Sequence, residues 1–132
     1  MEKKTQILIA DDSRADAELF TRAIGPFVGS KGLHVEYARY GEEALNLIKE
    51  KKYDLIFLDI SMPGPTGLEI LRYVKENHRK EKVVILTGYP DVDDHFCKML
   101  GADEYLEKPV DPKALGAILD KYVPSLGPDI KN

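Results

Sequence analysis

The sequence predicts an α/β domain in which a doubly wound, five-stranded parallel sheet carries helices on both faces. The first observation is that short apolar segments, typical of strands buried on both faces, alternate along the chain with longer segments of helical periodicity. The second is that parallel neighbours need a crossover connection, which the intervening helices supply. Such a sheet places all of its strand ends on one edge.

The clearest strand covers residues 54–59 and ends in Asp59. Its apolar run, Leu55 to Leu58, is followed by Met62-Pro63-Gly64-Pro65, which cannot continue regular structure. In α/β proteins ligand sites lie at the carboxyl edge of the sheet, where this strand ends. A lone Asp at such a place often only caps the next segment, so its meaning depends on the residues that converge with it.

The remaining strands and the helices complete the alternation. We expect the other strands at residues 6–10, 33–38, 83–86 and 104–107. We expect helices at residues 13–24, 42–51, 68–77, 92–100 and 111–122.

The first helix has both a start signal and a stop signal. Ser13, with Asp16 three residues later, fits a capping box that opens a helix. Gly25-Pro26 should end it, and the three glycines and one proline of residues 25–32 predict a loop.

The length and charge of the chain exclude several classes of protein. The 132 residues suffice for one domain, which we expect at residues 1–123, and residues 124–132 form a tail too short for an output domain. A net charge of -4, with acids and bases interspersed, argues against nucleic acid or an anionic membrane as partner. The apolar runs are too short for a transmembrane span or a secretory signal, so we expect a cytoplasmic protein.

Four predicted strands end in polar residues that would meet at one edge of the sheet. These residues are Asp11 and Asp12, Asp59, Thr87, and Lys108. Carboxylates so close together repel by on the order of 4 kcal/mol per pair at 4 Å and an effective dielectric constant of 20. A hard divalent cation relieves this repulsion, and Mg²⁺ suits one or two carboxylates plus a phosphate. Lys108 adds a positive charge suited to a phosphoryl oxygen.

These strand ends carry motifs that resemble the receiver domain of two-component response regulators, over residues 6–123. The motifs are Asp11-Asp12-Ser13, Asp59-Ile60-Ser61-Met62-Pro63, Thr87-Gly88, and Gly101 to Pro109. The resemblance implies a flavodoxin-like strand order, 2-1-3-4-5. It also implies a stand-alone signalling module that switches when it is phosphorylated.

The resemblance implies that Asp59 is the phosphoacceptor and that the acids bind a metal ion. Asp12, Asp59 and the backbone carbonyl of Ser61 would bind Mg²⁺, or Mn²⁺ in its place. Asp11 would act through a water molecule.

By the same resemblance, Thr87 and Lys108 would contact the phosphoryl group and Thr87 and Tyr105 would form the switch. From the residues alone, Tyr105 could equally be an ordinary strand residue with a packed ring. The resemblance further implies a cis peptide bond between Lys108 and Pro109.

Two further positions bear on the lifetime of the phosphorylated state. Ser61 and Tyr89 each lie two residues past a reacting strand-end group, so they should flank the path of an attacking water. Neither is an acid or an amide that would orient this water, which predicts slow self-dephosphorylation. The segment Gly64-Pro65-Thr66-Gly67 departs from the family pattern and leaves the conformation of that loop open.

The implied partners are a sensor histidine kinase or a histidine phosphotransfer protein, and a target that reads the face of the fourth helix, fifth strand and fifth helix. The competing hypothesis is a Mg²⁺-dependent phosphatase or phosphotransferase of the haloacid dehalogenase type, with Asp59 as nucleophile. Position 61 is Ser rather than the general acid or base that such an enzyme needs, and the chain has no cap domain. We therefore expect a phosphoacceptor and not an enzyme.

Overall fold

A computed structural model describes residues 3–77, 80–88 and 94–123 of the chain. Their strands form one sheet in the order β2-β1-β3-β4-β5, and every neighbouring pair is parallel, as predicted. The strands are β1 (Thr5–Ala10), β2 (Leu33–Ala38), β3 (Leu55–Asp59), β4 (Lys82–Thr87) and β5 (Glu104–Glu107).

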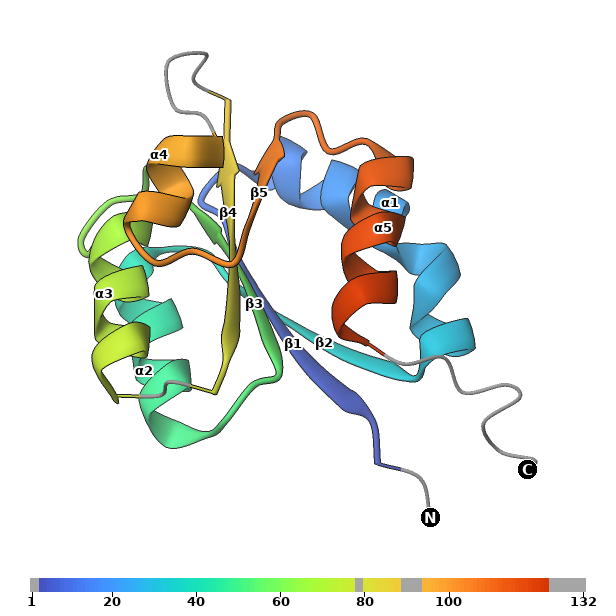
Figure 1. Ribbon diagram of the computed structural model, residues 1–132, viewed down its shortest axis with the longest axis horizontal. Coiled ribbons are helices and arrows are strands. Elements are labelled where there is room, and N and C mark those ends of the chain that lie inside the picture. Colours follow the sequence, from blue (N-terminus) through green and yellow to red (C-terminus); the bar gives the residue numbers. More distant parts are fainter. Residues whose placement is uncertain (1–2, 78–79, 89–93, 124–132) are drawn as a thin grey trace.

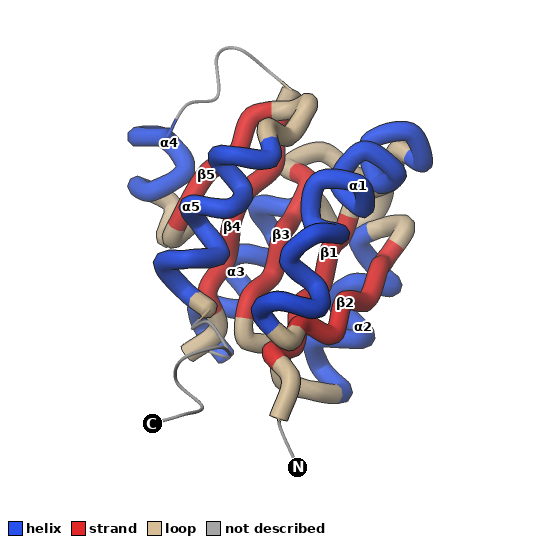
Figure 2. Tube along the Cα trace, turned by 90° about the vertical axis from the view of Figure 1, so that its right-hand side faces the viewer, coloured by secondary structure: helices blue, strands red, loops and turns tan. Residues whose placement is uncertain are grey.

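The helices cover both faces of this sheet (Figure 1). They are α1 (Arg14–Lys31), α2 (Gly41–Glu50), α3 (Gly67–Asn77), α4 (Asp94–Met99) and α5 (Pro112–Tyr122). Helices α1 and α5 lie side by side on one face, and Figure 2 shows them in front of the sheet with α2 and α3 behind it. The doubly wound α/β prediction is therefore confirmed.

Alternate residues of each strand belong to two separate hydrophobic cores, because successive side chains of a strand point to opposite faces of the sheet. Leu8, Ile56 and Ile85 belong to the core under α2 and α3. Phe57 belongs to the core under α1 and α5, where its ring meets that of Phe20 edge to face at a centroid distance of 4.9 Å. All residues of β3 are buried, as expected for the middle strand of a sheet covered on both sides.

The predicted end of the first helix at Gly25-Pro26 is wrong. Helix α1 continues through Pro26 to Lys31 and ends at Gly32, whose φ of 65° is the left-handed conformation that favours glycine. A proline inside a helix removes one backbone hydrogen bond and disfavours the helix. Packing of the residues beyond Pro26 outweighs this cost.

Two contacts with α5 hold the second half of α1. The ring of Phe27 fits over Gly116, where an added Cβ would lie 3.0 Å from its Cζ atom. The buried ammonium of Lys31 lies 2.7 Å from a carboxylate oxygen of Asp120. Both contacts join segments far apart in the sequence, so local sequence signals do not reveal them.

The ends of the other elements lie within two residues of the predicted ones. No helix in the described ranges is both long enough and apolar enough to cross a membrane. The predicted tail at residues 124–132 lies outside the described residues.

Candidate functional site

A cleft of about 340 Å³ opens at the carboxyl ends of the central strands. Its lining combines residues that are far apart in the sequence and that the parallel topology brings to one edge. They are Asp12, Ser13, Asp16, Asp59, Ser61, Gly88 and Lys108. This is the position at which the strand ends predict a ligand site.

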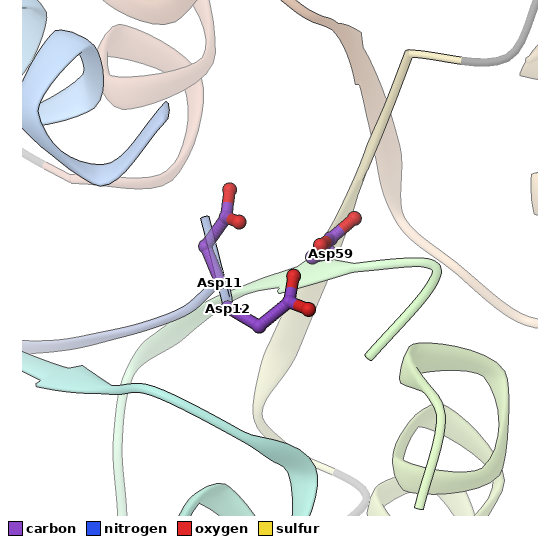
Figure 3. A group of neighbouring side chains, drawn as sticks. All are labelled: Asp11, Asp12 and Asp59. Atoms are coloured by element: carbon purple, nitrogen blue, oxygen red, sulfur yellow. The ribbon is translucent and has the colours of Figure 1, made fainter. Parts of the chain in front are cut away.

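Three carboxylates meet at this edge (Figure 3). Asp11 and Asp12 follow the end of β1, and Asp59 is the last residue of β3. Each offers an oxygen atom, and these atoms all lie within 4.8 Å of one another. Asp11 and Asp59 are buried, whereas Asp12 is exposed at the mouth of the cleft. The convergence expected from the strand ends is therefore present.

The backbone after each strand holds these carboxylates in place. The N–H of Ser13 donates to Oδ1 of Asp11 at 3.0 Å. In the same way, the N–H of Ser61 donates to Oδ1 of Asp59 at 3.3 Å. An Asp that accepts a hydrogen bond from the amide two residues later makes a local turn, so each side chain is fixed by the chain reversal that follows its strand.

Lys108 brings the positive charge of the site. It follows β5, its N–H donates to the carbonyl oxygen of Thr87 at 2.8 Å, and the peptide bond to Pro109 is cis. Its Nζ atom lies 2.9 Å from Asp11 and 3.3 Å from Asp59. Burial opposes the ammonium charge, but the neighbouring carboxylates outweigh it and raise the pKa of Lys108 above its usual value. The lysine therefore stays charged.

The carboxyl group of Asp59 is perturbed in the opposite sense. Burial, followed by repulsion from Asp11, raises the pKa of Asp59 from 3.8 to about 7, against the attraction of Lys108. Such a perturbed acid in a cleft is typical of a reacting group. Additional positive charge brought near Asp59 would lower its pKa and favour its ionised, nucleophilic form.

Asp16 is a member of the site that the sequence did not reveal. Its Oδ2 atom lies 3.1 Å from Nζ of Lys108, 92 positions away in the sequence. The predicted capping box is only half formed: Ser13 Oγ accepts from the N–H of Asp16 at 3.2 Å, while the Asp16 carboxylate turns to Lys108. The signal that could have indicated Asp16 is an acid in the first turn of the helix that follows a site-forming strand. The predicted capping box already accounted for this acid, so no role in the site was expected.

The predicted switch residues lie on the neighbouring strands β4 and β5 and are not part of the cleft lining. Thr87 is fully buried at the end of β4, and Gly88, the next residue, lines the cleft. Tyr105 is partly buried on β5 opposite Ile85, and it packs against the core under α2 and α3. Tyr89 lies outside the described residues.

The loop after Asp59 depends on two close backbone approaches. A Cβ on Gly67 would lie 2.1 Å from the carbonyl oxygen of Asp59, and one on Gly41 would lie 1.8 Å from that of Pro65. Both positions therefore require glycine. Thr66 and Glu69 form a capping box that starts α3, with backbone-to-side-chain distances of 2.8 and 3.2 Å. These contacts settle the loop conformation that the sequence left open.

The donor set suits a hard divalent cation. Three carboxylate oxygens cluster here, and two of the residues that carry them, the exposed Asp12 and the buried Asp59, line a cleft with room for water and a phosphate group. This is the oxygen-rich, partly open arrangement that Mg²⁺ prefers. The residues present therefore fit the metal ion that the sequence predicts.

Comparisons with known proteins agree with this geometry. The family model of the response regulator receiver domain matches residues 7–120. Response regulator MprA of Mycobacterium sp. (strain KMS) is 34% identical over 129 residues, which cover 94% of this chain and 54% of MprA. The probable transcriptional regulator ycf27 of Guillardia theta is 33% identical over 118 residues, which cover 89% of this chain and 44% of the relative. The chain thus spans about half the length of the curated relatives it matches.

Solved structures show the same fold. The receiver domain of AraT from Geobacillus stearothermophilus is 31% identical, with a TM-score of 0.78 over 91% of this chain and 93% of that one. A CheY-like receiver domain protein from Methanospirillum hungatei is 28% identical, with a TM-score of 0.76 over 90% of this chain and 93% of that one. The haloacid dehalogenase hypothesis finds no support among these relatives.

Proposed function

Since the chain belongs to the receiver domain family of response regulators, we propose that Asp59 accepts a phosphoryl group from a phosphohistidine donor. The donor would be a sensor histidine kinase or a histidine phosphotransfer protein. The observation that carries this proposal is the position of Asp59 at the cleft, buried beside two further carboxylates and 3.3 Å from the ammonium of Lys108.

The proposed transfer is a displacement at phosphorus. A carboxylate oxygen of Asp59 forms the new O–P bond, the N–P bond of the phosphohistidine breaks, and its electron pair stays on the imidazole nitrogen. Transfer of this kind depends on positioning and on neutralising the charge of the phosphoryl oxygens. Lys108 is placed to supply part of that charge, and the amide turns after each strand hold the acids still.

The proposed Mg²⁺ ligands are Asp12, Asp59 and the carbonyl oxygen of Ser61, with Asp11 acting through water. When bound, the cation supplies positive charge to the clustered carboxylates and to phosphoryl oxygens, and Mn²⁺ has the same preference for oxygen ligands. The exposed position of Asp12 supports its role, because its carboxylate reaches the cleft without first leaving an ion pair with Lys108.

The proposed output is a change in a protein-binding surface. The Thr87 hydroxyl would turn to a phosphoryl oxygen, and Tyr105 on the adjacent strand would turn inward into the space behind it. The register supports this coupling, since β4 and β5 are paired and Tyr105 lies opposite Ile85, two residues before Thr87. A target protein would then read the changed face of α4, β5 and α5.

We propose further that the phosphorylated state decays slowly. Ser61 lies exposed at the cleft, where its hydroxyl cannot act as a general base. Tyr89, two residues after Thr87 in the sequence, would add bulk on the other side of the attacking water.

The test is phosphate incorporation from acetyl phosphate in the presence of Mg²⁺, measured by intact mass. The parent protein should stop at one phosphate per chain, and Asp59→Asn should take up none. Asp111→Asn is the matched control, because Asn caps α5 as well as Asp and should leave incorporation unchanged. Incorporation by Asp59→Asn would overturn the assignment of the phosphoacceptor. Continuous release of many phosphates per chain would indicate a phosphatase instead.

A further inference from the structure

The carboxylate of Asp16 takes part in the site although the proposed transfer does not use it. It lies 3.1 Å from Nζ of Lys108 and lines the main cleft. It also lines a small neighbouring hollow, together with Leu19, Phe20 and Pro109. The carboxylate therefore stands at the edge of the space that a phosphoryl group on Asp59 would enter.

We propose that Asp16 is a positioning residue that holds the ammonium of Lys108 in the resting state and competes with the phosphoryl group for it. This inference rests on the proposed function of Asp59. Its consequence is that Asp16 weakens the phosphorylated state, so that removing its charge strengthens binding of a phosphoryl mimic.

The hydrogen-bonding capacity of Lys108 explains the competition. An ammonium group has three N–H donors. Three carboxylates surround Nζ: Asp11 at 2.9 Å, Asp16 at 3.1 Å and Asp59 at 3.3 Å. A phosphoryl oxygen can therefore gain a full hydrogen bond from Lys108 only if one of these three partners gives one up.

Of the two carboxylates that stay charged when Asp59 is phosphorylated, Asp11 and Asp16, Asp16 is the one that Lys108 can release at the lower cost. The Asp11 side chain is only 3% exposed, so losing the ammonium would leave a buried negative charge without its ion pair. The N–H of Ser13 would remain as a hydrogen-bond donor to Asp11 but carries no charge. Asp59 is not part of this comparison, because phosphorylation removes the charge of its carboxylate and places the phosphoryl oxygens beside Lys108. The Asp16 side chain is 35% exposed, so water can replace Lys108 as its partner.

The charge of Asp16 acts in the same direction. A phosphoryl group brings negative charge into a cleft that Asp16 lines, and like charges in a partly buried cleft repel each other. Neutralising Asp16 thus both frees a donor of Lys108 and removes one repelling charge.

The side chain of Asp16 can be changed without disturbing the start of α1. The helix cap uses the backbone N–H of Asp16, which donates to Ser13 Oγ at 3.2 Å, and does not use the Asp16 carboxylate. Asp16→Asn keeps this N–H and the size of the side chain. A change in ligand affinity would therefore report the lost charge and not a lost helix turn.

The first experiment measures the affinity for beryllofluoride, a phosphoryl mimic, by calorimetric titration in excess Mg²⁺. Asp16→Asn should bind about two- to fivefold more tightly than the parent, the range expected for a partly exposed ion pair. Asp16→Glu, which keeps the charge, should stay close to the parent. Glu18→Gln removes the same charge from an exposed position of the same helix and should not change the affinity.

The second experiment tests the resting contact by urea unfolding without Mg²⁺. Asp16→Asn is introduced both into the parent and into Lys108→Met. We expect it to lower the urea midpoint more, or raise it less, in the parent than in Lys108→Met, because the ion pair is present to be lost only in the parent. Additive shifts in this double-mutant cycle would overturn the inference. Equal or weaker beryllofluoride binding by Asp16→Asn would overturn it as well. Failure of the parent to bind beryllofluoride would instead contradict the proposed function.

Discussion

The Nζ atom of Lys108 lies 3.3 Å from Oδ1 of Asp59, so the proposed phosphoacceptor has a positive charge beside it before any phosphoryl group arrives. This attraction does not by itself determine the protonation state of Asp59. Burial and the nearby Asp11 outweigh it and raise the pKa of Asp59 to about 7. The site is thus electrostatically strained in the direction that a bound cation would relieve.

This strain predicts a pH dependence of stability in the absence of Mg²⁺. The folded state keeps a proton on Asp59 up to about pH 7, whereas the unfolded chain loses it near its ordinary pKa of 3.8. The contribution of Asp59 to stability is therefore fully present below pH 3.8 and declines as the pH rises to about 7. Asp59→Asn removes this titration and should be more stable than the parent at pH 8 by about 1 kcal/mol.

Urea unfolding of both proteins at pH 5 and pH 8, with a chelator present, measures this difference. The advantage of Asp59→Asn should be larger at pH 8 than at pH 5. An advantage that is the same at both values, or absent at pH 8, would show that Asp59 ionises without penalty.

The metal site predicts opposite behaviour for two charged residues of the cleft. Asp12→Ala should lose most Mg²⁺ affinity, about tenfold or more, because it removes the exposed carboxylate of the cluster. Lys108→Ala should bind Mg²⁺ at least as well as the parent, because it removes a positive charge from the same acids. Calorimetric titration with MgCl₂ measures both affinities. Equal affinity for Asp12→Ala and the parent would contradict the ligand assignment.

The lifetime of the phosphorylated state gives a third prediction. If the ring of Tyr89 shields the phosphoryl group from water, Tyr89→Ala should lose its phosphate several times faster than the parent. Both proteins would be phosphorylated in parallel with Mg²⁺ and their decay followed by intact mass. Unchanged or slower decay in the variant would rule out shielding by Tyr89 and leave the role of Asp59 untouched.

The continuous helix α1 gives a fourth prediction. Pro26 lies inside the helix, where it lacks the N–H that would complete the backbone ladder. Pro26→Ala should therefore raise the free energy of unfolding by about 1 kcal/mol or more. Lys31→Met serves as a contrasting variant, because it removes the ion pair to Asp120 while keeping the helix intact. A loss of stability in Pro26→Ala would mean that the proline fixes a bend that the packing on α5 requires.

The order of strands and helices was predictable because it depends on local patterns. The apolar run at Leu55–Asp59 has no polar interruption, and the glycines and prolines that follow it end the strand whatever the rest of the chain does. The parallel topology then brings Asp11, Asp12, Asp59 and Lys108 to one edge without further information. Local chemistry and one topological rule were therefore enough to predict the carboxylate cluster and its neighbouring lysine.

The sequence by itself determined the fold class, the strand ends and the acids that gather there. Only the tertiary structure decided that α1 passes through Pro26, because the contacts of Phe27 and Lys31 with α5 outweigh a local helix-breaking signal. It also decided that the Asp16 carboxylate turns to Lys108 and leaves the capping box half formed. Both outcomes depend on charge and packing between segments about 90 residues apart, where the free energy of a long-range contact exceeds the local preference that the sequence displays.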